Sequence, residues 1–407
     1  MTAMRTTRTP LALAVLAALA LLAAACSSGG TATSTDGAAP AGGEQPADKG
    51  DNPDEAPPTT IFVPRIFSIA ASGDILLHAM VIQSGQKYAG GKGYDFNPMF
   101  DKVRDEISSA DLAICHQETP ISAENKNLTV PNTLSFNAPK EIATALKGAG
   151  FDGCDTASNH TWDRQMAGVQ QTAQVLDEAG LKHAGGSRDQ AEADNPPIYD
   201  VKGVKVGHLA FSYTIYNNAG PDKTVPKEAP WLQAMLWPAI GAEGIIAQAK
   251  ALKARGAEFV VVSIHWGDQY VHEPNKDQRE LAKALLADPN IDLILGDHVH
   301  VVQPCEKIGD KYVTYGMGNF LSNQSPTIDR TLKNDNQDGS LQRFDVAEVA
   351  PGQFKVLKMT YTPTWVQLPG HQIQVATPDG QYKDSYNRTV KAMSMLGPTA
   401  CDATPTV

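Results

Sequence analysis

The sequence predicts an α/β protein in which helices cover the faces of a largely parallel sheet. From Arg65 to Asn323, short apolar runs alternate with polar loops and with segments that have helical spacing of apolar residues. The pattern is clearest where the apolar runs 259–264, 291–295 and 311–315 each end in a polar, glycine-containing loop. Open α/β sheets bind ligands at the carboxyl ends of their strands, so a functional site is expected in these loops.

The individual elements follow from local pattern. The earlier strands are expected at 66–71, 112–115, 151–156, in a short segment ending at Ala184, and at 204–211. Helices are expected at 100–110, 140–149, 168–179, 243–254 and 274–287. After Asn323 the alternation stops, and residues 342–349 and 353–360 flank Pro351-Gly352 as an antiparallel hairpin at a sheet edge. Residues 390–407 are poorly patterned and are expected to be frayed.

The N-terminus predicts export from the cytoplasm. Arg5 and Arg8 precede an apolar run, 11–25, that is short for a membrane span and is typical of a secretory signal. Cys26 follows Ala23-Ala24-Ala25 and looks like the lipidated cysteine of a bacterial lipobox, although Ala23 stands where that motif usually has leucine. A lipid anchor through Cys26 at the extracytoplasmic face of the bacterial membrane is therefore expected, with plain secretion as the alternative.

Composition divides the 407 residues into four expected parts. These are a signal peptide (1–25), a lipid-anchored flexible linker (26–62), a main domain (63–365) and a C-terminal extension (366–407). The linker is rich in small, polar and acidic residues, and it lacks the large apolar side chains that would repay the entropy of ordering it.

Charge and cysteine content exclude some classes of function. A net charge of -11 disfavours a nucleic-acid partner, which requires a basic face. Five cysteines are too few for a small disulfide scaffold, and none has the Cys-x-x-Cys spacing of a zinc ribbon. The four that follow the N-terminal region, Cys115, Cys154, Cys305 and Cys401, allow three disulfide connectivities, but buried free thiols are as plausible for the first three.

Polar residues collect at the expected strand ends. They are Asp74, His78, Glu118, Asn159, His160, His265, His298 and His300. A single such histidine is typically a hydrogen-bonded core residue, but several at successive strand ends, two of them as His-x-His, favour a metal site. Mixed nitrogen and oxygen ligands suit Mn, Fe or Zn better than Ca or Mg. The set is large enough for two ions that share a bridging carboxylate, an arrangement suited to phosphoryl transfer.

In combination these loops resemble a known family. The matching stretches are Gly73–His78, Ala110–Ile121, Ser158–Asp163, His265–Tyr270, Gly296–Pro304 and Tyr315–Phe320. They resemble the CapA-type capsule or poly-γ-glutamate synthesis proteins, which are related to calcineurin-like metallophosphoesterases. The resemblance extends over about residues 66–323 and implies a four-layer α/β/β/α metallophosphoesterase-like sandwich, here with a C-terminal β-hairpin extension.

The resemblance also implies roles for residues. The expected metal ligands are Asp74, Glu118, Asn159, His265, His298 and His300. Asp74 and His300 would bind one ion, Glu118 would bridge, and the other three would bind the second ion. His160 would donate a proton to the leaving oxygen. Further residues are possible ligands or supports of ligands: His78, His116, Asp163, Asp268 and Asn319.

Three departures from the family pattern bear on the chemistry. His78 lies four residues after Asp74, whereas the phosphoesterases have an Asp-x-His pair. His116 stands where the capsule family usually has asparagine and offers a substitute ligand. Glu118 replaces the bridging aspartate and is one methylene longer, which can alter the spacing of the ions.

Two functions are compatible with these observations. The first is a metal-dependent phosphoesterase-like hydrolase with two divalent ions, which acts on an anionic polymer or phosphoester beside membrane proteins of polymer synthesis. The second is a non-catalytic binding or scaffold subunit of such a complex, with a vestigial metal site. A lipid-anchored solute-binding protein is disfavoured by the strand-end histidines.

Overall fold

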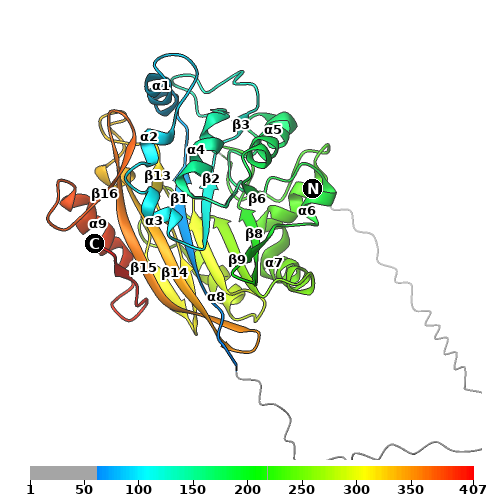
Figure 1. Cartoon of the computed structure of the whole chain (residues 1–407). Helices are drawn as coiled ribbons and strands as arrows, with labels where there is room; N and C mark the ends of the chain where they lie inside the picture. The colour runs from blue at the N-terminus through cyan, green and yellow to red at the C-terminus, as the bar shows by residue number, and fades with distance from the viewer. Residues whose placement is uncertain (1–61, 218) are drawn as a thin grey trace, which may run out of the picture. The chain divides into compact units, whose positions relative to one another are not determined.

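The computed structural model describes residues 62–217 and 219–407 (Figure 1). The expected signal peptide, Cys26 and the linker up to residue 61 lie outside the described residues. Within the described part of the chain, no helix combines the length and the apolar character needed to cross a membrane.

Two large sheets form the centre of the molecule. The larger has the order β16-β15-β14-β1-β2-β5-β6 (Gln372–Val375, Gln353–Gln367, Asp338–Ala350, Ile66–Ile75, Leu112–Gln117, Gly153–Asp155, Lys182–Ala184), with β13 (Asn319–Leu321) beside β1 and β17 (Thr404–Pro405) beside β15. The smaller has the order β11-β12-β10-β9-β8-β7 (Cys305–Ile308, Lys311–Thr314, Leu293–Asp297, Phe259–His265, Val204–Ser212, Ile198–Val201). A separate pair joins β3 (Ile121–Ser122) to β4 (Ala138–Pro139). Neighbours in β1-β2-β5-β6 and in β8-β9-β10-β12 are parallel.

The sheets pack face to face, and helices cover their outer faces (Figure 1). Between the sheets, Phe67 of β1 meets Phe259 of β9 edge to face, with ring centroids 5.7 Å apart. The larger sheet is covered by α1, α2, α3, α4 and α5 (Ala79–Tyr88, Asn97–Phe100, Arg104–Ser108, Glu141–Ala149, Gln165–Glu178). The smaller is covered by α7 (Trp237–Ala254) and α8 (Lys276–Leu286). The predicted α/β fold with four layers is confirmed.

Local sequence explains where several elements begin and end. At the start of α8 the side chain of Asn275 accepts a hydrogen bond from the backbone N–H of Gln278, and the side chain of Gln278 accepts one from the backbone N–H of Asn275. Gly150 ends α4 with φ 111°, a conformation that favours glycine. The expected helix 100–110 is instead two short helices, because the backbone at Val103 leaves the helical range (φ -119°) while its side chain stays in the core.

The chain after Asn323 is more ordered than its pattern indicates. The expected hairpin is present as β14 and β15, and β14 pairs with β1. The expectation of a frayed C-terminus is wrong, because α9 (Lys383–Met393) packs on this hairpin and β17 pairs with β15. A disulfide between Cys305 and Cys401 also ties the tail to β11. The other pair, Cys115 and Cys154, joins neighbouring positions of β2 and β5.

His371 predicts a pH dependence of stability. It is buried between the Ser84 hydroxyl and the Asn323 side chain, and burial lowers its pKa to about 4. Since the unfolded chain binds this proton near pH 6.5, stability is full above that pH and is lost as pH falls toward 4, by about 1.4 kcal/mol per pH unit at most. His371→Gln should reduce this slope in urea unfolding measured from pH 7 to pH 4 with a chelator present. An unchanged slope would contradict the assignment.

Candidate metal centre

Polar side chains from both sheets meet at one edge of the sandwich. Asp74 lies near the end of β1, Glu118 directly follows β2, and His265 ends β9. The loop after β10 brings His298 and His300, and the loop after β5 brings Asn159 and His160. All of these side chains are buried. Parallel strands end at a shared edge, so residues far apart in sequence become neighbours there.

Interatomic distances show how closely the six expected ligands lie. The Nδ1 of His300 is 2.9 Å from Oδ2 of Asp74, and its Nε2 is 3.7 Å from Oε1 of Glu118. The Nε2 of His265 is 2.8 Å from Oδ1 of Asn159. The ring centroid of His298 is 4.4 Å from that of His265. The structure therefore brings all six side chains into one cluster.

The backbone at this cluster is constrained. His298 and His300 have φ values of 96° and 56°, which residues with a Cβ rarely adopt outside functional sites. Gly73, next to Asp74, lies so close to Gly318 that an added Cβ would clash with the carbonyl oxygen of Gly318. These close approaches hold the ligand-bearing loops against each other.

Several buried polar atoms of the cluster have no hydrogen-bond partner within the described residues. They are Nε2 of His116, Oε1 and Oε2 of Glu118, Nδ1 of His265, Oδ1 of Asp297 and Nδ1 of His298. Unpaired buried carboxylate and imidazole atoms are costly unless a cation binds them. Two sets of ligand atoms also lie within 4.8 Å of one another: Asp74 with His116 and His265, and Asp74 with Glu118 and His300. The residues present therefore fit a divalent metal ion.

The histidines of the cluster are of two kinds, which differ in the direction of their pKa shifts. Burial lowers the pKa of His298 to about 3 and that of His265 well below its usual value. Burial also lowers the pKa of His300, but the carboxylates of Glu118 and Asp74 outweigh it and raise the value to about 9. For His116, Asp155 and Asp297 likewise outweigh burial and raise the pKa. Burial raises the pKa of Glu118. The carboxylates thus draw positive charge to the cluster.

The five residues that the sequence analysis gave as possible ligands or supports of ligands lie in different surroundings. His116 joins the cluster, with Nε2 3.8 Å from Oδ1 of Asp74. Asp163 binds Nδ1 of His160 at 2.8 Å, and Oδ1 of Asn319 lies 3.2 Å from Nδ1 of His300. His78 lies outside both ligand sets that include Asp74, with Nδ1 3.2 Å from the Leu76 carbonyl. Asp268 is exposed and accepts a hydrogen bond from Asn275, so it is a loop residue.

The sequence analysis did not single out three side chains at the centre: the buried carboxylates of Asp155 and Asp297, and the aromatic ring of Tyr213. Asp155 lies 2.6 Å from Nδ1 of His116 and orients that imidazole. Asp297, His116 and Asp155 offer a third set of ligand atoms within 4.8 Å, and burial raises the pKa of Asp297 well above its usual value. Tyr213 packs on His298 with ring centroids 4.6 Å apart. Asp155 and Asp297 each end a buried strand, which is the signal that identified the other residues.

Two hollows flank the centre. One, of about 350 Å³, is lined by Asn159, Tyr213 and His298 together with Asp268 and Trp266. The other, of about 610 Å³, begins at His78 and Tyr270, and the Tyr270 ring lies 6.0 Å from that of His300. A substrate can therefore extend from the centre in two directions.

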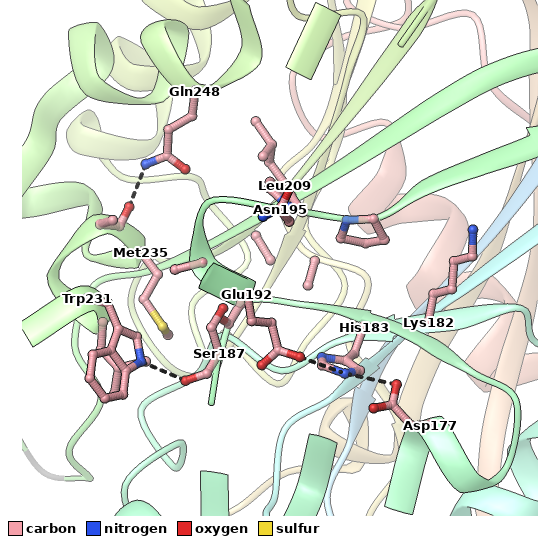
Figure 2. A pocket seen from close by; sticks show the side chains of 18 residues that line it. Asp177, Lys182, His183, Ser187, Glu192, Asn195, Leu209, Trp231, Met235 and Gln248 are labelled. Atoms are coloured by element: carbon pink, nitrogen blue, oxygen red, sulfur yellow. Dashed lines mark hydrogen bonds and ion pairs between the residues drawn. The ribbon is translucent and has the colours of Figure 1, made fainter. Parts of the chain in front are cut away.

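A further cavity of about 200 Å³ is separate from this cluster (Figure 2). Its polar groups are paired with one another: His183 faces Asp177 and Glu192, and the Trp231 indole N–H donates to the Ser187 carbonyl oxygen. None of the clustered metal-ligand sets includes its residues. These side chains therefore serve as matched controls for variants of the centre.

The chain matches a known family of bacterial proteins over more than half of its length. The family described as "Bacterial capsule synthesis protein PGA_cap" matches residues 68–324. Among curated proteins, "PGA biosynthesis protein CapA" of Bacillus subtilis is 26% identical over 332 residues, covering 81% of this chain and 78% of that protein. "Capsule biosynthesis protein CapA" of Bacillus anthracis is 29% identical over 257 residues, covering 63% of this chain and 59% of that protein.

Two solved structures that the chain matches are less similar to it in sequence. The calcineurin-like phosphoesterase YfkN of Bacillus subtilis is 14% identical with a TM-score of 0.44, covering 81% of this chain and 98% of that chain. A structure described as a novel phosphatase from Mycoplasma pneumoniae is 15% identical with a TM-score of 0.42, covering 74% of this chain and 94% of that chain.

Replacing one ligand should weaken metal binding. His298→Ala removes an imidazole from the cluster, and affinity for Mn²⁺ or Zn²⁺ should fall by about tenfold or more, since even residues that only orient ligands contribute that much. Equilibrium dialysis followed by elemental analysis measures the change. His183→Ala, in the separate cavity, should keep wild-type metal content. Equal metal content in all three proteins would contradict the site.

Proposed function

Because the chain belongs to the bacterial capsule synthesis protein PGA_cap family, we propose that it takes part in making or exporting an anionic surface polymer of the poly-γ-glutamate type. The names of its relatives, which concern capsule and PGA biosynthesis, support this role. Its activity would be that of a metal-dependent hydrolase of phosphate esters.

The observation that carries this proposal is the cluster of unpaired buried ligand atoms. Asp74 and His300 would hold one divalent ion, Glu118 would bridge, and the second ion would be held by Asn159, His265 and His298. The mixed ligand set favours Mn, Fe or Zn. Such ions supply Lewis acidity that polarises a phosphoryl oxygen and stabilises the charge that develops on it.

In this proposal His160 is the proton donor. Its Nδ1 is held by Asp163 at 2.8 Å, and its Nε2 lies 4.0 Å from Oε1 of Glu118. When water attacks phosphorus and the bond to the leaving oxygen breaks, protonated His160 gives its Nε2 proton to that oxygen and regains one from the attacking water. Asp163 keeps the ring oriented. Phe136 packs edge-on against the imidazole and limits its movement.

The proposed location is the outer face of the cell membrane. Lipidation at Cys26 would anchor the chain, and the segment up to residue 62 would act as a tether. This location would place the centre beside membrane proteins that synthesise or export the polymer, with an anionic polymer or phosphoester as substrate. Labelling with a radioactive fatty acid in cells, lost in Cys26→Ser, tests the anchor.

Hydrolysis of simple esters tests the chemistry. With Mn²⁺ present, the protein should hydrolyse p-nitrophenyl phosphate or its bis-ester, and a chelator should abolish turnover. His160→Ala should lower kcat by about a hundredfold or more, because a general acid typically contributes that much, while metal content stays unchanged. His183→Ala should retain wild-type turnover. Bound metal without turnover of either ester would favour a non-catalytic binding subunit instead.

A further inference from the structure

Beside the metal centre, two adjoining hollows form one long groove, called the side groove below. The first is the hollow of about 610 Å³ that begins at His78 and Tyr270. The second, of about 660 Å³, continues to Trp365 and Tyr382. Met80 and Ile328 line both hollows, so the two lie side by side. The side groove therefore leads from the centre to the hairpin side of the fold.

The walls of the side groove are rich in side-chain amides. They come from α1, from the 323–337 segment, from the end of β15 and from loops: Gln83, Asn132, Asn323, Gln324, Asn334, Gln337, Gln367 and Gln381. In the described part of the chain, no hydrogen bond engages the side chains of Gln83, Asn132, Asn334 or Gln381, which are exposed. Each amide can both donate and accept. These four side chains thus offer unused hydrogen-bonding capacity along the groove.

Charge is sparse in the side groove. Its charged residues are Lys87, Asp329 and Arg330, which leave one net positive charge over both hollows. Nearby Arg388 is paired with Asp338 at 2.7 Å and adds no free cation. A polymer with one carboxylate per residue would need a series of cations here to bind with useful affinity. The side groove is therefore suited to an uncharged polar chain.

The aromatic residues and the strands near the side groove limit the kinds of polymer that it can bind. The rings of Trp365 and Tyr382 are stacked, with centroids 6.3 Å apart, and form an apolar wall at the far end. Aromatic walls next to hydrogen-bonding side chains suit ligands that have both apolar and polar surfaces, as sugar rings do. None of the lining residues belongs to the edge strand β16, so an extended peptide cannot add to the sheet within this groove.

We propose that the side groove binds a neutral oligosaccharide chain, with the amides bonding its hydroxyls and Trp365 and Tyr382 packing against its sugar rings. The assignment of the oligosaccharide as part of the substrate rests on the proposed function, because the sugar bound in the side groove would lie next to the group that reacts at the metal centre. Binding itself uses no metal ligand. It can therefore be measured independently of hydrolysis, and a protein that turns over no ester would still give a decisive binding result.

Calorimetric titration of the full chain with maltohexaose and with chitohexaose tests the proposal. At least one of these neutral sugars should bind, and Trp365→Ala should weaken its binding by about tenfold, as loss of an aromatic contact residue typically does. The double variant Gln83→Ala/Gln381→Ala changes only exposed side chains, so it should fold normally and weaken binding by about threefold or more. Trp231→Ala removes an aromatic ring from the separate cavity in Figure 2 and should bind as wild type does.

Several results would overturn the proposal. One is the absence of a binding heat for both sugars with the wild-type protein. Another is a double amide variant that binds the sugar as tightly as wild type. Displacement of the bound sugar by short poly-γ-glutamate at equal concentration would assign the groove to a polyanion. Binding of a neutral hexapeptide but of neither sugar would assign the groove to a polypeptide.

Discussion

Asp74 joins the two sheets of this protein at the candidate metal centre. It belongs to the larger sheet, yet one oxygen accepts the backbone N–H of His298 at 3.1 Å, and the other accepts Nδ1 of His300 at 2.9 Å. Both histidines follow a strand of the smaller sheet. The carboxylate is fully buried, so its charge depends on these partners. Without this contact, the ligands from the two sheets would not face a common point.

The close packing of buried carboxylates and imidazoles at this centre also explains the pKa shifts of its histidines. Buried carboxylates raise the pKa of His300 and His116, while burial keeps His298 and His265 neutral with a lone pair available for a cation. The departures from the family pattern act within this arrangement. His116 replaces an amide but is held by Asp155, so its free nitrogen points toward Asp74. The longer Glu118 still reaches His300.

The surroundings of the centre leave room for a large bound molecule. Two hollows of different character open from it, one near Tyr213 and Asp268 and the other along the amide-rich side groove. Family membership by itself points to an anionic polymer, whereas the side groove carries little positive charge. The two observations are compatible if a neutral chain is joined to the group that reacts at the centre.

Local pattern was enough to predict the α/β layering, the polar side chains that gather at the strand ends and the family, because buried strands and their polar ends are encoded in short stretches of sequence. It failed where long-range packing decides the outcome. The break at Val103, the ordered C-terminal tail, and the cysteine pairing depend on partners that are remote in sequence. Asp155 and Asp297 carry the same strand-end signal as the expected ligands. Their part in the centre emerges only when both sheets end at one edge, since that edge alone brings their carboxylates to His116.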